Sequence, residues 1–234
     1  MTDSTLLVDI GNSKTGLADY GSGHISKTRW LDTAIIQSSA PFEGYVRIVV
    51  SSVVPDLDHF LPGHAQFITH QNIPNLTINL SSPNEVGADR IVNALAAYSG
   101  QKRSCLVVDS GTATTFCYVT QSGVYEGGAI FPGLKMSSQA LNDHTAKIPL
   151  IWVEPQPRMY GKNTEQAVQV GLYHGFIAMI NGMIAQYRQL DPLIWVVGTG
   201  NGLSILKDQL KLDAYDPDLI FKGLAVCAEK TNRP

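Results

Sequence analysis

The stretch Leu6-Leu-Val-Asp-Ile-Gly-Asn-Ser-Lys-Thr-Gly16 decides the fold, because a related stretch returns 100 residues later as Leu106-Val-Val-Asp-Ser-Gly-Thr-Ala-Thr-Thr-Phe116. In each, an apolar strand runs into an aspartate, a small polar turn that contains glycine follows, and a second strand begins. Over positions 6–23 and 106–123, seven of eighteen residues are identical without a gap. This repeat indicates duplication of a strand–turn–strand unit, and a chance likeness of two short apolar strands is the alternative.

Between and after the two copies, predicted strands alternate with predicted helices. The stretch Val46-Arg-Ile-Val-Val-Ser-Ser-Val-Val54 ends at Pro55 and predicts a buried strand, and a second strand predicted over 194–197 leads into a glycine-rich turn over 198–202. Apolar periodicity predicts helices over residues 87–100, 136–144 and 164–190. Because strands and helices alternate, we expect an α/β fold.

The duplication also predicts how the chain is divided. We expect two similar lobes, residues 1–100 and 101–234, each with a mixed sheet, and a nucleotide cleft between them.

Composition excludes several classes of function. Apolar residues make up 44% of the 234 residues and charged residues 16%, which is typical of a globular protein. The net charge of −3 gives no electrostatic attraction to nucleic acid or to an anionic membrane. No uninterrupted apolar run approaches the roughly 20 residues of a membrane span, and the N-terminal apolar run is too short for a secretory signal. We therefore expect neither nucleic acid nor a membrane as partner.

The three cysteines, Cys105, Cys117 and Cys227, cannot all pair in disulfides and form no CxxC motif. In apolar surroundings a thiol acts as a small hydrophobic group. This pattern favours the reducing cytoplasm.

Asp9 and Asp109 suggest phosphate chemistry. Each ends a strand before a glycine-containing turn, where backbone N–H groups can approach phosphate oxygens. A carboxylate beside phosphate needs a cation between them. Two such turns could hold one nucleoside triphosphate from both sides. Alternatively, each aspartate caps its own turn by accepting local N–H groups.

Eight motifs resemble, in this order, those of type III pantothenate kinases. They are Asp9-Ile-Gly-Asn-Ser13, Ser51-Ser-Val-Val-Pro55, Gly87-Ala-Asp-Arg90, Asp109-Ser-Gly-Thr-Ala113, Gly127-Gly-Ala-Ile-Phe-Pro-Gly133, Thr145-Ala-Lys-Ile-Pro149, Gly161-Lys-Asn-Thr-Glu-Gln-Ala167 and Asp218-Leu-Ile-Phe-Lys-Gly-Leu224. The two aspartate motifs indicate only the acetate and sugar kinase, heat-shock chaperone and actin superfamily. The motifs that begin at Gly87 and Gly161 are far more specific.

The resemblance implies a duplicated actin-like, ribonuclease H-like ATPase fold. It implies phosphorylation of pantothenate by ATP to 4'-phosphopantothenate, the first step of coenzyme A biosynthesis. The implied cofactors are ATP, magnesium and a monovalent cation, either potassium or ammonium. It also implies a homodimer whose second protomer contributes to the pantothenate pocket, and the apolar residues around the 164–190 helix are compatible with either a dimer interface or a core.

By this resemblance, the first turn binds the phosphates of ATP through Asp9, Ile10, Gly11, Asn12, Ser13, Lys14, Thr15 and Gly16. Asp9 would face magnesium and its waters, Thr112 would contact ATP, and Asp109 would hold the monovalent cation.

The same resemblance puts Gly87, Ala88, Asp89 and Arg90 at pantothenate, with Asp89 as general base and Thr164 also reaching the substrate. A planar guanidinium such as that of Arg90 suits a carboxylate or phosphate. The alternative is that Asp89 and Arg90 only cap a helix and form a surface ion pair.

Two positions depart from the family pattern. Leu80 stands where members often carry a substrate-contacting tyrosine, and Asn201 replaces the second glycine of an adenine-side Thr-Gly-Gly. The first puts one pantothenate contact in doubt, and the second puts nucleotide affinity and base preference in doubt.

Other functions remain as alternatives at this point. They are a sugar kinase or polyphosphate phosphatase of the same superfamily, and a regulatory protein, since relatives of this family were first described as accessory factors for virulence transcription. The acidic balance of the chain disfavours direct DNA contact.

Overall fold

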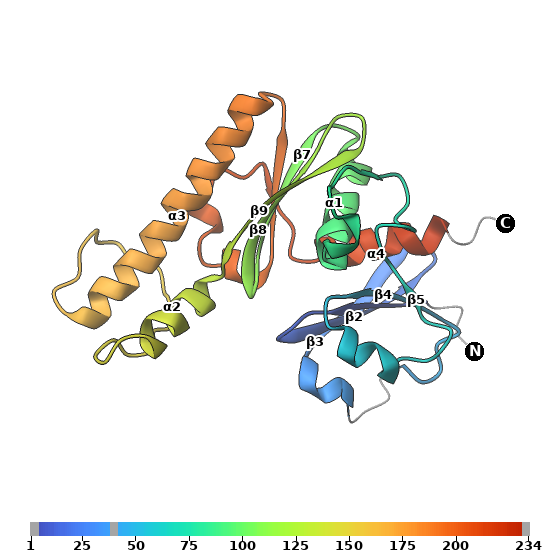
Figure 1. Ribbon diagram of the computed structural model, residues 1–234, viewed down its shortest axis with the longest axis horizontal. Coiled ribbons are helices and arrows are strands. Elements are labelled where there is room, and N and C mark those ends of the chain that lie inside the picture. The colour runs from blue at the N-terminus through green and yellow to red at the C-terminus, as the bar shows by residue number, and fades with distance from the viewer. Residues whose placement is uncertain (1–4, 38–41, 231–234) are drawn as a thin grey trace. The chain divides into compact units, whose positions relative to one another are not determined.

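The computed structural model describes residues 5–37 and 42–230 and confirms the expected α/β fold with two mixed sheets (Figure 1). The strands are β1 (Thr5–Ile10), β2 (Lys14–Gly21), β3 (His24–Asp32), β4 (Arg47–Ser52), β5 (Gln66–Phe67), β6 (Thr77–Ile78), β7 (Cys105–Ser110), β8 (Ala113–Val119), β9 (Val124–Pro132), β10 (Trp195–Thr199) and β11 (Ala214–Tyr215). The α-helices are α1 (Ala88–Gln101), α2 (Leu134–Asp143), α3 (Thr164–Leu190) and α4 (Leu219–Lys230). Short 3-10 helices are η1 (Thr33–Gln37), η2 (Pro55–Phe60), η3 (Pro83–Glu85), η4 (Asn201–Leu203) and η5 (Lys207–Gln209).

The two sheets repeat one strand order, which agrees with the duplication seen in the sequence. The first sheet runs β3-β2-β1-β4-β5. The second, read from one edge, runs β6-β9-β8-β7-β10-β11, so five of its strands reproduce the first order with β6 added beside β9. In both sheets the strand whose last-but-one residue is the predicted aspartate lies inside the sheet, and its neighbour β4 or β10 runs parallel to it.

The first sheet is buried on both faces. Leu6, Val8 and Ile10 of β1 join a cluster under η1 and η2. Leu7 lies on the opposite face, where α1 and α4 contact β1 and β4. The helices α1 and α4 approach so closely that a Cβ atom on Gly223 would lie 2.2 Å from the carbonyl oxygen of Val92.

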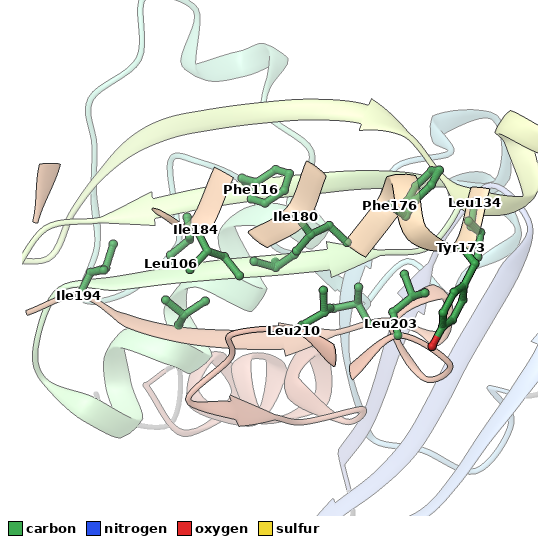
Figure 2. Packing of buried hydrophobic residues seen from close by; sticks show 13 residues of the cluster. Leu106, Phe116, Leu134, Tyr173, Phe176, Ile180, Ile184, Ile194, Leu203 and Leu210 are labelled. Carbon is green, nitrogen blue, oxygen red and sulfur yellow. The ribbon is translucent and has the colours of Figure 1, made fainter. Parts of the chain in front are cut away.

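The second sheet is covered by α3, the long orange helix of Figure 1. Figure 2 shows Phe176, Ile180 and Ile184 of α3 packed over Leu106 and Phe116 of the sheet. The buried stripe of α3 recurs at intervals of three or four residues, as an amphipathic helix requires.

Only α3, among the described helices, is long and apolar enough to cross a membrane by length and composition. From the sequence we had expected no such helix, because no uninterrupted apolar run is long enough. The core helix of a soluble protein passes the same test, and Ile180 and Ile184 are fully buried in the core.

The chain forms two compact units that are not continuous halves of the sequence. Unit 1 comprises residues 1–102, 119–127 and 218–234, and unit 2 comprises 103–118 and 128–217. The predicted lobes, 1–100 and 101–234, follow the repeat in the sequence, so α4 falls in the second lobe but in the first compact unit.

Candidate active site

The first predicted phosphate turn connects β1 to β2 in unit 1. Asn12, Ser13 and Lys14 are exposed, whereas Ile10, Thr15 and Gly16 are buried. The N–H of Gly11 donates to the carbonyl of Lys14 at 3.0 Å and closes the turn. Exposed backbone in a tight turn is the part that can meet a phosphate.

The buried members of the predicted set have packing contacts. Ile10 belongs to the core of unit 1. A Cβ on Gly16 would lie 2.8 Å from the rings of Trp30 and Phe221, so glycine at this position lets two aromatic side chains close over β2. Any contribution of Ile10 or Gly16 to phosphate binding would have to come from the backbone.

Val53 connects this turn to the start of α1. Its N–H donates to the carbonyl of Ile10 at 3.0 Å. Its Cγ1 atom lies 3.3 Å from the place of a Cβ on Gly87. The chain therefore brings together three of the quoted motifs, those of Asp9, Ser51 and Gly87, within one compact unit. From the sequence alone, no role had been predicted for the Ser51 motif.

At the start of α1, Gly87 is the N-cap and contributes no side-chain hydrogen bond. Ala88 is buried, and Asp89 and Arg90 are partly buried. Asp89 Oδ1 accepts the N–H of Arg90 at 2.8 Å, which is one contact expected of a residue that supports a helix N-terminus. A Cβ on Gly87 would lie 2.5 Å from Asp89 Oδ1, so glycine leaves room for this carboxylate.

The pKa of Asp89 lies above its ordinary value. Burial, which disfavours the charged carboxylate, is the largest cause, and it outweighs the hydrogen bond from the Arg90 N–H and the charge of Arg90, which both act to lower the pKa. A desolvated carboxyl group with a raised pKa is typical of a general base.

The second predicted turn connects β7 to β8 in unit 2. Asp109 pairs with Thr199 in the parallel register of β7 and β10, so both strands end at the same edge of the sheet. Gly200, with φ of +85°, lies against the aspartate, because a Cβ there would be 2.4 Å from Asp109 Oδ1. Below the turn, Ser110 Oγ and Thr114 Oγ1 are hydrogen-bonded at 2.8 Å.

Thr112 is exposed on this turn, and its carbonyl accepts the N–H of Gly133 at 3.0 Å. A Cβ on Gly133 would lie 2.3 Å from the carbonyl oxygen of Gly111 and 2.4 Å from that of Thr112. The motif that ends at Gly133 therefore supports the Asp109 turn from behind.

Thr164 is the exposed first residue of α3. The N-cap Asn163 accepts the N–H of Gln166 at 2.8 Å, and the Gln166 side chain accepts the N–H of Lys162 at 3.0 Å. A Cβ on Gly161 would lie 2.2 Å from the Ala167 nitrogen. Much of this specific motif thus builds the helix start that presents Thr164.

The two departures from the family pattern lie in different units. Leu80 is partly buried, and its Cδ2 atom lies 3.0 Å from the place of a Cβ on Gly127. Asn201 is exposed at the start of η4, beside Gly200.

A cavity of about 520 Å³ in unit 1 is lined by Ile36, Gln37, Phe42, Glu43, Gly44, Tyr45, Phe60, Leu61, Pro62 and His64. It contains none of the predicted site residues, so we do not assign it to the nucleotide or to pantothenate.

The donor set of the first turn fits magnesium chemistry. No group of three or more histidine, cysteine or acidic side chains among the described residues could hold a metal ion alone. Magnesium is commonly bound through one or two carboxylates together with substrate phosphates and water. A single carboxylate beside an exposed turn, as at Asp9, meets that requirement.

Solved structures share the fold of the chain. A conserved Campylobacter jejuni protein provisionally described as a Baf family transcriptional activator aligns over 97% of this chain and 98% of its own, with a TM-score of 0.69 and 20% identity. A ROK family glucokinase from Streptomyces griseus aligns over 97% of this chain and 99% of its own, with a TM-score of 0.53 and 11% identity. The fold is that of the actin-like kinases.

Sequence comparison is more specific. The family described as type III pantothenate kinase matches residues 5–186. A type III pantothenate kinase from Syntrophotalea carbinolica is 34% identical over 249 residues, which cover 94% of this chain and 96% of the relative. Another from Listeria monocytogenes is 36% identical over 199 residues, which cover 80% of this chain and 76% of the relative. The chain belongs to the type III pantothenate kinase family, and it is an enzyme, an ATP-using phosphotransferase.

Proposed function

We propose that this kinase transfers the γ-phosphate of ATP to the primary hydroxyl of pantothenate, which gives 4'-phosphopantothenate and ADP and begins coenzyme A biosynthesis. Family membership supports the reaction. The observation that carries the mechanism is Asp89, a carboxylate with a raised pKa at the start of α1, joined through Val53 to the Asp9 turn.

Asp89 acts as the general base in this proposal. Its carboxylate accepts the proton of the pantothenate hydroxyl while the hydroxyl oxygen forms a bond to the γ-phosphorus. The bond from that phosphorus to the oxygen it shares with the β-phosphate breaks, and ADP leaves with the electron pair. Because Oδ1 already accepts the Arg90 N–H, the second carboxylate oxygen is the better placed to take the proton.

The backbone of the exposed residues Asn12, Ser13 and Lys14 binds phosphate oxygens, and Asp9 would hold magnesium through its waters. Magnesium, when bound, spreads the negative charge that develops on the phosphates. The ammonium of Lys14 lies 2.5 Å from Asp32 Oδ1, and both side chains are more than half exposed, so the lysine can turn toward a phosphate.

The Asp109 turn has two roles. Thr112 contacts ATP from its exposed position, and Asp109 holds potassium or ammonium beside the phosphates. The close packing of Gly200 against Asp109 Oδ1 supports a fixed orientation of this carboxylate.

Pantothenate is bound by Gly87, Ala88, Asp89 and Arg90, with Thr164 also in reach of it. The partly buried Arg90 offers a guanidinium that suits the carboxylate of pantothenate.

We also propose a homodimer in which the second protomer contributes to the pantothenate pocket. Gly171, Gly175 and Gly182 are exposed on α3, and apart from their chain neighbours and the backbone of α3 itself nothing lies within 4 Å of a Cβ placed on any of them. This glycine face is open on the side of α3 opposite Phe176 and Ile180. A second backbone can approach such a face closely, and Thr164 at the start of the same helix would couple assembly to substrate binding.

A cytoplasmic location belongs to the proposal as well. All three cysteines are described and buried, and none is in a disulfide. Burial raises the pKa of Cys105 to about 12, so its thiol stays protonated and acts as part of the core.

The deciding experiment is a coupled assay of ADP release with purified protein, magnesium and potassium. We expect release that depends on pantothenate and is absent with hexoses. Release with a hexose instead would favour a sugar kinase, and no release with either would favour a regulatory role.

A further inference from the structure

Thr33 lies directly behind the first phosphate turn. It follows β3 and begins η1, and it is 5% exposed. Because Lys14 and Asp32 are register partners in the hairpin of β2 and β3, the next residue along the chain, Thr33, meets the turn that precedes β2.

Thr33 makes two hydrogen bonds to carbonyls of the turn. Its hydroxyl donates to the carbonyl oxygen of Gly11 at 2.7 Å. Its N–H donates to the carbonyl oxygen of Ser13 at 3.2 Å. The hydroxyl is also 3.2 Å from Thr15 Oγ1, which is buried as well.

These bonds fix the direction of the neighbouring N–H groups. In a trans peptide the C=O and the following N–H point in opposite directions. With the Gly11 carbonyl held toward Thr33, the N–H of Asn12 points away from Thr33. The Ser13 carbonyl, held by the Thr33 N–H, likewise directs the N–H of Lys14 away from Thr33. An anion is attracted by such N–H groups and repelled by carbonyl oxygens.

We propose that Thr33 is a positioning residue that orients the Asn12 and Lys14 N–H groups toward the phosphates of bound ATP. The inference rests on the proposed function only in taking this turn as the phosphate site.

The second unit has a similar contact, although it is made to a different carbonyl of its turn. Gly133 stands 100 residues after Thr33, at the same offset as the two aspartates, and it also follows the third strand of its repeat. Its N–H donates to the carbonyl of Thr112 at 3.0 Å, and its missing side chain leaves room for the turn's carbonyls. In both repeats, the N–H of the residue after the third strand donates to a carbonyl of the turn.

The test compares Thr33→Val, which keeps the shape but removes the hydroxyl, with Thr33→Ser, which retains it. Thr5→Val is the matched control, because Thr5 is a buried threonine at the opposite end of β1. The first readout is calorimetric binding of a non-hydrolysable ATP analogue with magnesium, without pantothenate. The second is the pair of KM values for ATP and pantothenate.

We expect Thr33→Val to weaken analogue binding and raise the KM for ATP about tenfold, as for loss of one hydrogen bond to an anion-binding turn. The KM for pantothenate should change little, and Thr33→Ser and Thr5→Val should resemble the unaltered protein. If Thr33→Val is poorly folded by circular dichroism, Thr33→Ala is measured below its unfolding temperature with the same expectation.

Unchanged analogue binding in a folded Thr33→Val or Thr33→Ala protein would overturn the inference. Equal weakening in Thr33→Ser, or an equal rise in both KM values, would overturn it too, because either result indicates general loss of structure. Failure of the proposed function looks different, since the unaltered protein would then bind the analogue but release no ADP with pantothenate.

Discussion

At the scale of single residues, the candidate base Asp89 is subject to two opposing effects on its pKa. Asp89 accepts an N–H in the first turn of α1, yet burial still raises its pKa. If Asp89 served only to cap the helix, the helix N-terminus would stabilise its charged form, and its pKa would lie below the ordinary value. The raised pKa means that the folded protein disfavours the charged form, which is a cost that function can explain.

The substitution Asp89→Asn tests this view. Loss of a general base should lower kcat by roughly 10²–10⁴-fold. Because the folded protein disfavours the ionised carboxylate, removal of the charge should leave the melting temperature at pH 7 unchanged or higher. Near-normal turnover would remove Asp89 from the mechanism, and a marked fall in melting temperature would favour the capping role.

The raised pKa of Asp89 also predicts how activity and stability change with pH. The base must be ionised to act, so kcat/KM should fall as the pH drops through the pKa of Asp89 in the folded protein, at a higher pH than an ordinary aspartate would give. For stability the sign is reversed, because protonation relieves the buried charge as the pH falls through the same value. A pH–rate profile that stays flat down to the ordinary aspartate range would contradict this assignment.

Asp109 gives the second prediction at this scale. If its carboxylate holds a monovalent cation beside the phosphates, activity should require potassium or ammonium and fail in sodium alone. Asp109→Ala should be inactive in every one of these salts. Full activity of the unaltered enzyme in sodium buffer, measured by ADP release, would show that no such cation is needed.

At the scale of elements, the local sequence pattern predicted the helices that bury one face and expose the other. The helix predicted over 164–190 has the bounds of α3, and those over 87–100 and 136–144 correspond closely to α1 and α2. The predicted strand over 46–54 is shorter in the structure. There β4 covers Arg47–Ser52, and η2 begins at Pro55.

The helix α4 could not be predicted from periodicity. It is buried on most sides, since it contacts both α1 and the first sheet, and its sequence has no continuous polar face. Thr33 was missed for a related reason, and the quoted motif that ends at Gly133 was given no role. Their importance comes from contacts about 20 residues away along the chain, which no local pattern records. The family motifs supplied the rest of the candidate site.

The crossing of α1 and α4 gives a prediction about stability. Gly223→Ala should destabilise the protein by about 1–3 kcal/mol, because the new methyl group would overlap the Val92 carbonyl and the helices would have to separate. Gly100→Ala, in α1 with open space around it, is the matched control and should be neutral or stabilising by up to about 1 kcal/mol. Equal midpoints in urea unfolding for the two variants would show that the crossing is not tight.

At the scale of the whole molecule, the proposed homodimer can be separated from core packing, because Gly175 faces outward. Light scattering at micromolar concentration should report about twice the chain mass of 25.4 kDa. Gly175→Leu should shift the protein toward the monomer and lower activity, whereas Gly100→Leu, also exposed on a helix, should do neither. An unaltered enzyme that is monomeric and fully active at every concentration would exclude both the dimer and the shared site.

The return of α4 to unit 1 has a consequence for synthesis on the ribosome. The strands of the first sheet are made early, but the helix that covers Leu7 and its neighbours follows more than a hundred residues later, after all of unit 2. At about 5–20 residues per second, the roughly 150 residues between β5 and α4 take about 8–30 seconds. During this time α1 covers only part of this face of the nascent sheet, and the part that α4 covers stays open, so unit 1 cannot be completed before unit 2 has emerged. The chain therefore cannot fold one complete domain after another as it leaves the ribosome. We expect a chaperone to bind the open part of this face.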